Sequence, residues 1–342
     1  MDRFERPRVA VVGATGAVGR TMVAILEERE FPLSDLRLLA SARSAGTAVG
    51  TRWGDVVVED LAAADPAGID IALFSAGGSR SREHAPRFAA AGTVVVDNSS
   101  AFRREPEVPL VVAGVNDAVI EAHQGIVANP NCTTMALMMA AGPLHRAAGL
   151  ERMVASSYQA TSGSGQAGIE LLLGETDGFA TDPAALADGT WTDPGNDLYS
   201  RPIGFNVLPL AGSITDQGYT DEEWKLVNET RKILDAPDIL VEPTCVRVPT
   251  LVGHGIAATM WFSRPLPLAE ARSVLSLAPG TQLWDDEKVP TPLDSAGIDD
   301  VLVGRVRETL GEPGGISLWV VGDNLRKGAA LNTVQLAELL LA

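Results

Sequence analysis

The sequence predicts an α/β fold built as two domains, in which a doubly wound parallel sheet precedes an α+β domain with a mostly antiparallel sheet. Three observations support this prediction. The chain has 342 residues, which is more than one ordinary hydrophobic core needs. Its first third alternates short apolar runs with helical periodicity, a pattern typical of βαβ units. After about residue 131, longer loops and β-rich segments replace that pattern.

The first domain is expected to contain short parallel strands separated by helices. Two amphipathic stretches, Ala17–Arg29 and Arg82–Ala91, predict helices because their apolar residues recur at helical spacing. Parallel strands need crossover connections of this kind. The expected strands are Arg8–Val12, Leu36–Ala40, Ile69–Phe74, Val94–Val96 and Ile126–Ala128.

The second domain has a different pattern of loops, helices and strands. The Gly/Asp/Pro-rich stretch 176–202 predicts a long loop. A helix is expected at Asp221–Leu234, with Thr220 as its N-cap and acidic residues in its first turn. The expected strands are Cys245–Val248, Ile256–Phe262, Val301–Arg307 and Ile316–Val321.

The carboxyl end of the chain carries a last helix, about Leu325–Leu341, that is strongly apolar on one face. We expect this helix to return to the first domain and pack on it. The expected domains are therefore residues 1–131, completed by the helix at 324–342, and residues 132–323.

The composition excludes several classes of function. There are 27 basic and 44 acidic side chains, and the resulting net charge of −17 repels nucleic acid and anionic lipid. No apolar run reaches the roughly 18 residues that span a bilayer, and no signal segment precedes the first strand. Cys132 and Cys245 form neither a disulfide framework nor paired metal-ligand spacing. We expect a cytoplasmic protein without a metal site.

A glycine-rich turn joins the first strand to the first helix. Residues Gly13 to Gly19 read G-x-x-G-x-x-G, directly after Val9–Val12. Glycines let the backbone approach a pyrophosphate, whose charge is then met by amide N–H groups at the helix start. A turn that only packs helix on strand is the alternative. Its position at the first strand–helix junction favours a Rossmann-type dinucleotide site.

The residues after the second strand indicate which dinucleotide binds. An NAD site places a carboxylate about 20 residues beyond the glycines, where it holds the ribose hydroxyls. Here Ser41-Ala42-Arg43-Ser44 follow the strand, and a guanidinium flanked by hydroxyls suits a 2′-phosphate. A solvated loop arginine is the alternative interpretation of Arg43. The sequence therefore favours NADP.

Cys132 is the candidate nucleophile. The segment Asn129-Pro130-Asn131-Cys132-Thr133-Thr134 follows a strand and precedes the apolar stretch Met135–Ala141. Capping by Asn129 or Asn131 places Cys132 in the first turn of a helix, where the helix dipole stabilises a thiolate. Such a thiolate can form a thioester. Cys245 lies inside a β-run and is expected to be a core residue.

Several motifs together resemble the aspartate-semialdehyde dehydrogenase family, in its bacterial branch, and they run in order across nearly the whole chain. Two stretches depart from the family's sequence pattern. Gly114-Val115-Asn116 stands where the family has Glu-Val-Asn, and the loop Asp188–Asn196 also differs. The matching motifs are Gly13–Gly19, Ser41-Ala42-Arg43-Ser44, Asp97-Asn98-Ser99-Ser100-Ala101-Phe102-Arg103, Asn129-Pro130-Asn131-Cys132-Thr133-Thr134, Ser157-Tyr158-Gln159-Ala160-Thr161-Ser162-Gly163, Arg247-Val248-Pro249 followed by Gly253-His254, and Gly322-Asp323-Asn324-Leu325-Arg326-Lys327-Gly328-Ala329.

The resemblance implies a role for each matching position. Cys132 is similar to the thioester-forming nucleophile, His254 to the general acid/base, and Gln159 to the residue that orients the substrate. Substrate contacts are implied at Arg247 for the α-carboxylate, at Glu222 near the α-amino group, and at Arg103, Asn131 and Lys225 for the phosphate. A solvated i,i+3 pair on one helix face is the alternative for Glu222 and Lys225. The implied cofactor contacts are Gly13, Thr15, Gly16, Ala17, Val18, Ser41, Arg43, Ser44, Ser75, Ser162, Gly163 and Asn324.

The resemblance also implies the reaction. It is the reductive dephosphorylation of L-4-aspartyl phosphate to L-aspartate 4-semialdehyde with NADPH, in the biosynthesis of lysine (through diaminopimelate), threonine, methionine and isoleucine. The second domain is expected to be catalytic and to form a homodimer or a dimer of dimers. One alternative is N-acetyl-γ-glutamyl-phosphate reductase, whose blocked amine does not call for Glu222. The other is a non-catalytic NADP-binding regulator, which gives no reason for Cys132, Gln159, Arg247 and His254 to occur together.

Overall fold

The computed structural model describes residues 5–341, which divide into two compact units. The first unit comprises residues 5–142, 228–237 and 325–341, and the second comprises residues 143–227 and 238–324. The chain passes between the units inside helices α3 (Cys132–Ala148) and α6 (Asp221–Ile233). Among the described residues, no helix combines the length and apolarity needed to cross a membrane.

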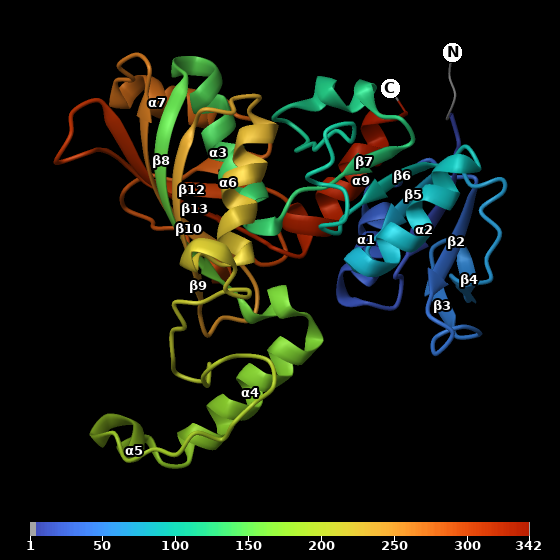
Figure 1. Cartoon of the computed structure of the whole chain (residues 1–342), viewed down its shortest axis with the longest axis horizontal. Helices are drawn as coiled ribbons and strands as arrows, with labels where there is room; N and C mark the ends of the chain where they lie inside the picture. Colours follow the sequence, from blue (N-terminus) through green and yellow to red (C-terminus); the bar gives the residue numbers. More distant parts are fainter. Residues whose placement is uncertain (1–4, 342) are drawn as a thin grey trace. The chain divides into compact units, whose positions relative to one another are not determined.

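The first unit contains a seven-stranded sheet with the strand order β3-β4-β2-β1-β5-β6-β7 (Figure 1). Neighbouring strands are parallel except β3 and β4. The five strands expected here are present, with ends that move by at most two residues. The strands are β1 (Arg8–Val12), β2 (Asp35–Ala40), β3 (Ala48–Thr51), β4 (Gly54–Asp60), β5 (Ile71–Phe74), β6 (Val94–Asp97) and β7 (Ile126–Ala128).

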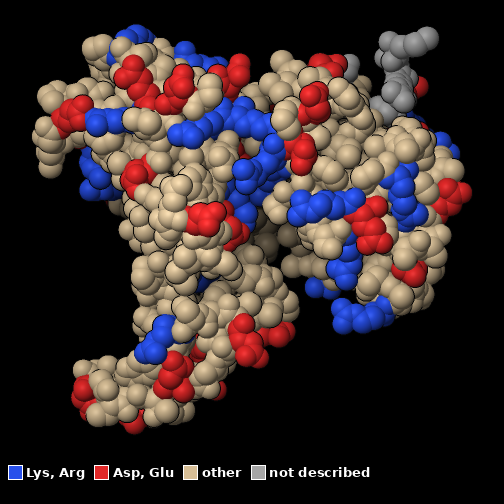
Figure 2. All heavy atoms as spheres, viewed as in Figure 1, with Lys and Arg blue, Asp and Glu red and all other residues tan. Residues whose placement is uncertain are grey.

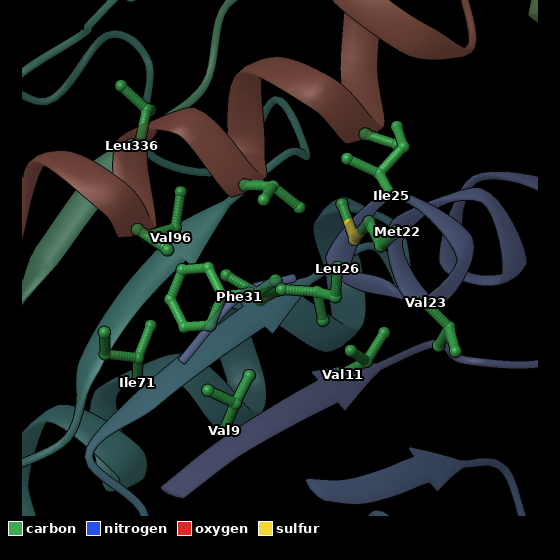
Figure 3. Close-up of a cluster of buried hydrophobic side chains, with 14 of the residues drawn as sticks. Val9, Val11, Met22, Val23, Ile25, Leu26, Phe31, Ile71, Val96 and Leu336 are labelled. Atoms are coloured by element: carbon green, nitrogen blue, oxygen red, sulfur yellow. The ribbon is translucent and has the colours of Figure 1, made fainter. Parts of the chain in front are cut away.

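Helices cover both faces of this sheet. Alternate residues of β1 point to opposite faces, so that Val9 and Val11 belong to one hydrophobic cluster and Ala10 and Val12 to another. Figure 3 shows the first cluster, where side chains of α1 (Ala17–Glu28) and α9 (Leu331–Leu339) meet those of the strands. The second cluster contains Ala85 and Phe88 of α2 (Gly78–Ala90). This arrangement confirms the doubly wound prediction.

The carboxyl-terminal helix differs from its expected form. One continuous helix was expected at Leu325–Leu341, but the chain forms a π-helix at Arg326–Ala330 before α9 begins. Lys327 lies buried in that π-helix, and its Nζ donates to the carbonyl of Ala113 at 2.9 Å and to Oε1 of Gln335 at 2.7 Å. A buried ammonium needs such acceptors, which gives a physical reason for the wider turn.

The second unit contains a six-stranded sheet with the order β11-β12-β13-β10-β8-β9. β10 pairs antiparallel with β8 and β13, and β12 pairs antiparallel with β13, so the sheet is mostly antiparallel as expected. β8–β9 and β11–β12 are the parallel pairs. The strands are β8 (Leu150–Gln159), β9 (Leu240–Arg247), β10 (His254–Phe262), β11 (Thr281–Leu283), β12 (Val301–Glu308) and β13 (Gly315–Gly322).

Two expectations for this unit need correction. The strand expected at Cys245–Val248 begins at Leu240, because β9 is an edge strand and tolerates Pro243, which interrupts the sequence signal. The stretch 176–202 is not all loop, since α4 runs to Ala180 and α5 follows. The remaining helices are α4 (Gln166–Ala180), α5 (Pro183–Asp188), α7 (Leu268–Ser276) and α8 (Pro292–Ser295), with short 3₁₀ turns at Asp117–Ala122, Thr161–Ser164 and Asp216–Gly218.

The N-cap expected for α6 is confirmed as a full capping box. The hydroxyl of Thr220 accepts from the Glu223 backbone N–H at 3.2 Å, and the Glu223 carboxylate accepts from the Thr220 N–H at 2.7 Å. The helix ends at Ile233, one residue before the expected end.

Candidate active site

The three glycines of the first turn have different structural roles. Gly13 has a φ of +87°, and a Cβ there would collide with the Ser75 carbonyl. A Cβ on Gly19 would collide with the carbonyl of Gly13. At Gly16 the nearest atom to an added Cβ is the Gly13 carbonyl oxygen at 3.3 Å, and no side chain caps the helix that begins after it. The outer glycines therefore close the turn, while the middle one leaves the N-terminus of α1 accessible.

The second-strand loop lies beside this turn. Gly13 and Ala14 donate their N–H groups to the carbonyl of Leu39, at 2.7 and 3.2 Å, near the end of β2. The hydroxyls of Thr15 and Ser44 lie 3.3 Å apart. Arg43 is exposed in the same loop. An uncapped helix start, hydroxyls and a guanidinium thus lie together, which fits a phosphorylated dinucleotide.

Asn131 is the residue that caps α3, the helix that begins at Cys132. Its side-chain Oδ1 accepts from the N–H groups of Thr133 at 2.9 Å and Thr134 at 3.3 Å, and α3 begins at Cys132. Asn129, the other candidate cap, is buried, and its amide donates to Oδ1 of Asn98 at 2.6 Å. Cys132 is partly exposed, whereas Cys245 is buried in β9 as expected. The cap and the helix start stabilise a thiolate at Cys132.

Arg103 lies in the same unit as Cys132 and is buried. Its Nε donates to the carbonyl of Asn129 at 2.8 Å, and its Nη2 donates to the carbonyl of Asn98 at 2.9 Å. These bonds fix the guanidinium against the segment that leads into α3.

In the second unit, four of the expected site residues lie at the same end of neighbouring strands in the sheet. Gln159 ends β8 and Arg247 ends β9, and the two are direct partners in this parallel pair. His254 begins β10, which runs antiparallel to β8, so it lies at the same end of the strands as Gln159. Asn324 follows β13, whose Gly322 pairs with His254. All four side chains are buried.

His254 has a defined tautomer. Its Nδ1 accepts the backbone N–H of Ala160 at 3.1 Å, so the proton of the neutral ring is on Nε2. Within residues 5–341, Nε2 is buried and has no hydrogen-bond partner. Burial, and then the nearby Arg247 guanidinium, lower the pKa of His254 to about 3, although a backbone contact with Gly253 acts in the opposite direction. The ring is therefore neutral and offers an N–H donor.

Arg247 lies near His254. Its Nη1 donates to the carbonyl of Ala160 at 2.8 Å, and its guanidinium carbon lies 5.8 Å from the centre of the Tyr199 ring. A Cβ on Gly163 would lie 3.0 Å from Arg247 Nη1 and 3.4 Å from His254 Nε2. Gly163 therefore borders both groups, and any larger side chain there would reduce the room for a ligand.

Ser162 and Asn324, both expected near the cofactor, are joined directly. Asn324 Nδ2 donates to the Ser162 hydroxyl at 2.9 Å, and Asn324 Oδ1 accepts the Gly253 N–H at 2.9 Å. Gln159 Nε2 donates to the hydroxyl of Ser157 at 3.2 Å. The backbone N–H of Ala160 binds His254, and its carbonyl binds Arg247. The sequence could not indicate this role, because every residue carries a backbone carbonyl and nearly every residue carries an N–H.

Glu222 and Lys225 form a partly buried ion pair. Lys225 Nζ lies 2.6 Å from Glu222 Oε1 and 2.6 Å from Asp221 Oδ2. Burial lowers the pKa of Lys225, but the two carboxylates more than offset this and hold it above its usual range. The i,i+3 contact therefore exists, but the lysine is only 25% exposed and is not a fully solvated side chain.

The expected residues thus fall into two groups. The first unit holds the glycine turn, Arg103, Asn131 and Cys132, and the second holds Gln159, Glu222, Lys225, Arg247, His254 and Asn324. The departure at Gly114 also has a local reason. This residue has a φ of +90°, where a glutamate would be strained, and its N–H donates to Oδ1 of Asp117 at 2.6 Å.

Comparisons with known proteins identify two family domains in the chain. Residues 8–123 match the semialdehyde dehydrogenase NAD-binding domain, and residues 142–327 match the semialdehyde dehydrogenase dimerisation domain. The aspartate-semialdehyde dehydrogenase of Mycolicibacterium smegmatis is 52% identical over 98% of this chain and 99% of its own length. That of Streptomyces akiyoshiensis is 53% identical over 98% of both chains.

A solved structure shares the whole fold. Aspartate semialdehyde dehydrogenase II from Vibrio cholerae, complexed with ASA, superposes with a TM-score of 0.91 at 44% identity and covers 98% of each chain. The matched domains together span most of the sequence, and the relatives align from end to end. The chain therefore belongs to the aspartate-semialdehyde dehydrogenase family.

Proposed function

We propose that the chain reduces L-4-aspartyl phosphate to L-aspartate 4-semialdehyde with NADPH, through a thioester on Cys132. The observation that carries this proposal is the position of Cys132 as the first residue of α3, capped by Asn131. Its family membership supplies the reaction, which serves the biosynthesis of lysine, threonine, methionine and isoleucine.

In the proposed cycle, the Cys132 thiolate attacks the carbonyl carbon of the acyl phosphate. The bond from that carbon to the phosphate oxygen breaks, and inorganic phosphate leaves as the thioester forms. Bound NADPH supplies the hydride that reduces the thioester carbonyl. When the carbon–sulfur bond breaks, Cys132 leaves as a thiolate and the aldehyde is released. The same steps in reverse consume inorganic phosphate.

The other residues bind and orient the reacting groups. We assign His254 as the general acid/base at the carbonyl oxygen, acting through Nε2, the nitrogen that carries the proton in the neutral ring. Gln159 orients the substrate beside the cysteine, and Arg247 binds the α-carboxylate because a guanidinium offers paired donors. Glu222 faces the α-amino group. Arg103, Asn131 and Lys225 hold the phosphate.

The proposed NADP site uses the glycine turn and the loop after β2. The accessible start of α1 suits the pyrophosphate, and Arg43 with its flanking hydroxyls suits the 2′-phosphate. The proposed contacts are Gly13, Thr15, Gly16, Ala17, Val18, Ser41, Arg43, Ser44 and Ser75, with Ser162, Gly163 and Asn324 on the nicotinamide side.

We further propose that the enzyme is cytoplasmic and assembles as a homodimer, or as a pair of dimers. The match of residues 142–327 to a dimerisation domain supports assembly through the second unit. Sedimentation of the purified enzyme distinguishes a dimer from a tetramer.

The decisive measurement is NADPH formation from aspartate semialdehyde and NADP, with and without phosphate. Wild type should turn over only with phosphate, and Cys132→Ala should be inactive. Cys245→Ala is the matched control, because it removes the buried cysteine of β9 and should keep phosphate-dependent turnover. Absence of turnover in a folded wild type that binds NADP would refute the proposal, and N-acetylglutamate semialdehyde would be the next substrate.

A further inference from the structure

Glu229 is a buried carboxylate that none of the roles above uses. It lies in the second half of α6, within the first unit, and is 3% exposed. Its Oε1 accepts from Nη1 of Arg103 at 3.2 Å, and its Oε2 accepts from the backbone N–H of Asn131 at 2.6 Å. One side chain thus bridges the proposed phosphate-binding arginine and the residue next to the nucleophile.

The bond to Asn131 completes the cap of the nucleophile helix. The side chain of Asn131 accepts the N–H groups of Thr133 and Thr134, whereas its own backbone N–H points away from that helix and needs an acceptor in this buried place. Glu229 is that acceptor. It therefore restrains the backbone from which Cys132 begins α3.

The bond to Arg103 sets the orientation of the guanidinium. A guanidinium has five N–H donors. Three of them are used by the carbonyls of Asn129 and Asn98 and by Glu229, which leaves two for an anionic ligand.

A separate contact anchors the backbone of the Arg103 loop. Lys232, one turn beyond Glu229, donates from Nζ to the carbonyls of Arg103 at 3.0 Å, Glu105 at 2.7 Å and Val108 at 2.7 Å. A change at Glu229 therefore leaves this loop anchored and acts on the guanidinium and on Asn131. Stability alone does not explain the pair, since a buried ion pair is often matched or exceeded in stability by apolar residues of similar volume.

We propose that Glu229 is a positioning residue for the acyl-phosphate reaction, which holds the Arg103 guanidinium and the Asn131 backbone in register with the Cys132 thiolate. This inference rests on the proposed roles of Arg103 and Cys132. In this proposal Glu229 acts through Arg103 and Asn131.

The test compares Glu229→Gln, Glu229→Asp and the matched control Glu223→Gln. Gln at position 229 can still accept the Asn131 N–H but carries no charge for Arg103, whereas Asp keeps the charge on a shorter arm. Glu223 lies on the same helix, is buried, and accepts the backbone N–H groups of Thr220 at 2.7 Å and Cys245 at 2.9 Å. It therefore reports the effect of neutralising a buried carboxylate of α6 that does not contact Arg103.

The first readout is phosphate dependence of turnover. We expect kcat/KM for phosphate to fall at least about tenfold in Glu229→Gln, the scale for losing one charged hydrogen bond. Glu229→Asp should recover part of the loss, and Glu223→Gln should keep the wild-type KM for phosphate even where it lowers Tm. Wild-type phosphate kinetics in Glu229→Gln, or an equal loss in Glu223→Gln, would overturn the proposal. If Glu229→Gln does not fold, Glu229→Asp alone decides, and unchanged kinetics there count against it.

The second readout does not depend on turnover. The pH midpoint for alkylation of Cys132 by iodoacetamide should move down by roughly half a unit or more in Glu229→Gln, because the variant removes a negative charge from beside the backbone of Asn131, the residue before Cys132. Glu223→Gln should keep the wild-type midpoint. If wild type turns over without phosphate or not at all, the proposed function fails, while this midpoint still tests Glu229. An unchanged midpoint would contradict the positioning role.

Discussion

At the residue scale, the chemistry of His254 follows from two neighbours rather than from the residue itself. The Ala160 N–H occupies Nδ1, and protonation of that nitrogen would break the bond and set two N–H groups against each other. The Arg247 guanidinium adds repulsion in a buried site. The imidazole is therefore a neutral donor at the pH where the enzyme works. A histidine in a sequence reveals neither its charge nor its tautomer.

This environment predicts a pH dependence of stability. The pKa of His254 is about 3 in the folded chain, against 6.5 for an unperturbed imidazole. Below pH 6.5 the unfolded state therefore binds a proton that the native state does not, and the unfolding free energy falls as pH drops towards 3. The slope from this group approaches about 1.4 kcal/mol per pH unit. Urea unfolding of wild type at several pH values between 4 and 7 measures it.

His254→Asn is the reference variant for that measurement. The Oδ1 of Asn can replace Nδ1 as acceptor for the Ala160 N–H, but it does not titrate. The part of the pH slope due to His254 should therefore disappear in the variant. Equal slopes in the two proteins would show that the ring titrates normally in the folded state.

Gly163 supports a second residue-scale prediction. A methyl group at this position would press against Arg247 Nη1 and the unpartnered Nε2 of His254, so Gly163→Ala should raise KM for aspartate semialdehyde or lower kcat by about tenfold or more. Gly174→Ala is the control. Gly174 lies in α4 with no atom within 4 Å of an added Cβ, and the change should leave kinetics unaltered and slightly stabilise the helix. Unaltered kinetics in Gly163→Ala would contradict the placement of the substrate beside Arg247 and His254.

At the element scale, the start of α3 places Cys132 where a helix N-terminus favours a thiolate. The helix supplies unpaired N–H groups, and Asn131 satisfies two of them while it sets the first turn. Helix α6 is built in a similar way, because Thr220 and Glu223 cap it and its later turns reach the Arg103 loop. The sequence indicated Thr220 as the cap of α6 and left Asn129 and Asn131 as alternatives for α3, because capping depends on residues only two or three positions apart.

Removing the cap should affect both stability and reactivity. Asn131→Ala leaves two N–H groups without their acceptor, so we expect a loss of about 1–2 kcal/mol in unfolding free energy and slower alkylation of Cys132 at pH 7. Asn196→Ala is a matched control, since Asn196 Oδ1 also accepts two backbone N–H groups, from Leu198 and Tyr199, but no helix or thiol follows. Alkylation at the wild-type rate in Asn131→Ala would show that the cap does not tune the thiol.

At the scale of the whole molecule, the chain is strongly acidic although its substrates are anions. Figure 2 shows acidic and basic side chains spread over the visible surface, with acidic groups on the segment that carries α4 and α5. Arg103 and Arg247 are both buried, and each is held by a backbone carbonyl, so these two positive charges are fixed locally. In the proposed function they bind the anionic groups of the substrate. Burial also reduces screening of these charges by salt.

The return of the carboxyl-terminal helix to the first unit predicts where stability is sensitive. Leu336 of α9 is fully buried in the cluster of Figure 3, so Leu336→Ala should lower the unfolding free energy by about 2–5 kcal/mol. Leu277 is 79% exposed, and Leu277→Ala should change it by less than about 0.5 kcal/mol. Thermal or urea unfolding measures both. Equal, small losses would mean that α9 adds little to the core.

The sequence by itself determined the features that depend on neighbouring residues. Strand β1, the glycine turn, the cap of α6 and the candidate nucleophile all follow from local spacing, and each lies in the structure within a residue or two of its expected place. The resemblance of several ordered motifs then indicated the family, because such motifs are far more specific together than alone.

Only the tertiary structure decided the features that depend on distant residues. Strand β8 escaped prediction because apolar Val154 and Tyr158 occupy exposed positions, which obscures the apolar–polar alternation that indicates a half-buried strand. The bridge from Glu229 to Arg103 joins residues 126 positions apart, and the tautomer of His254 is set by a backbone N–H 94 positions away. Such contacts form only when the chain folds, because burial, rather than local propensity, selects the partner of a polar group.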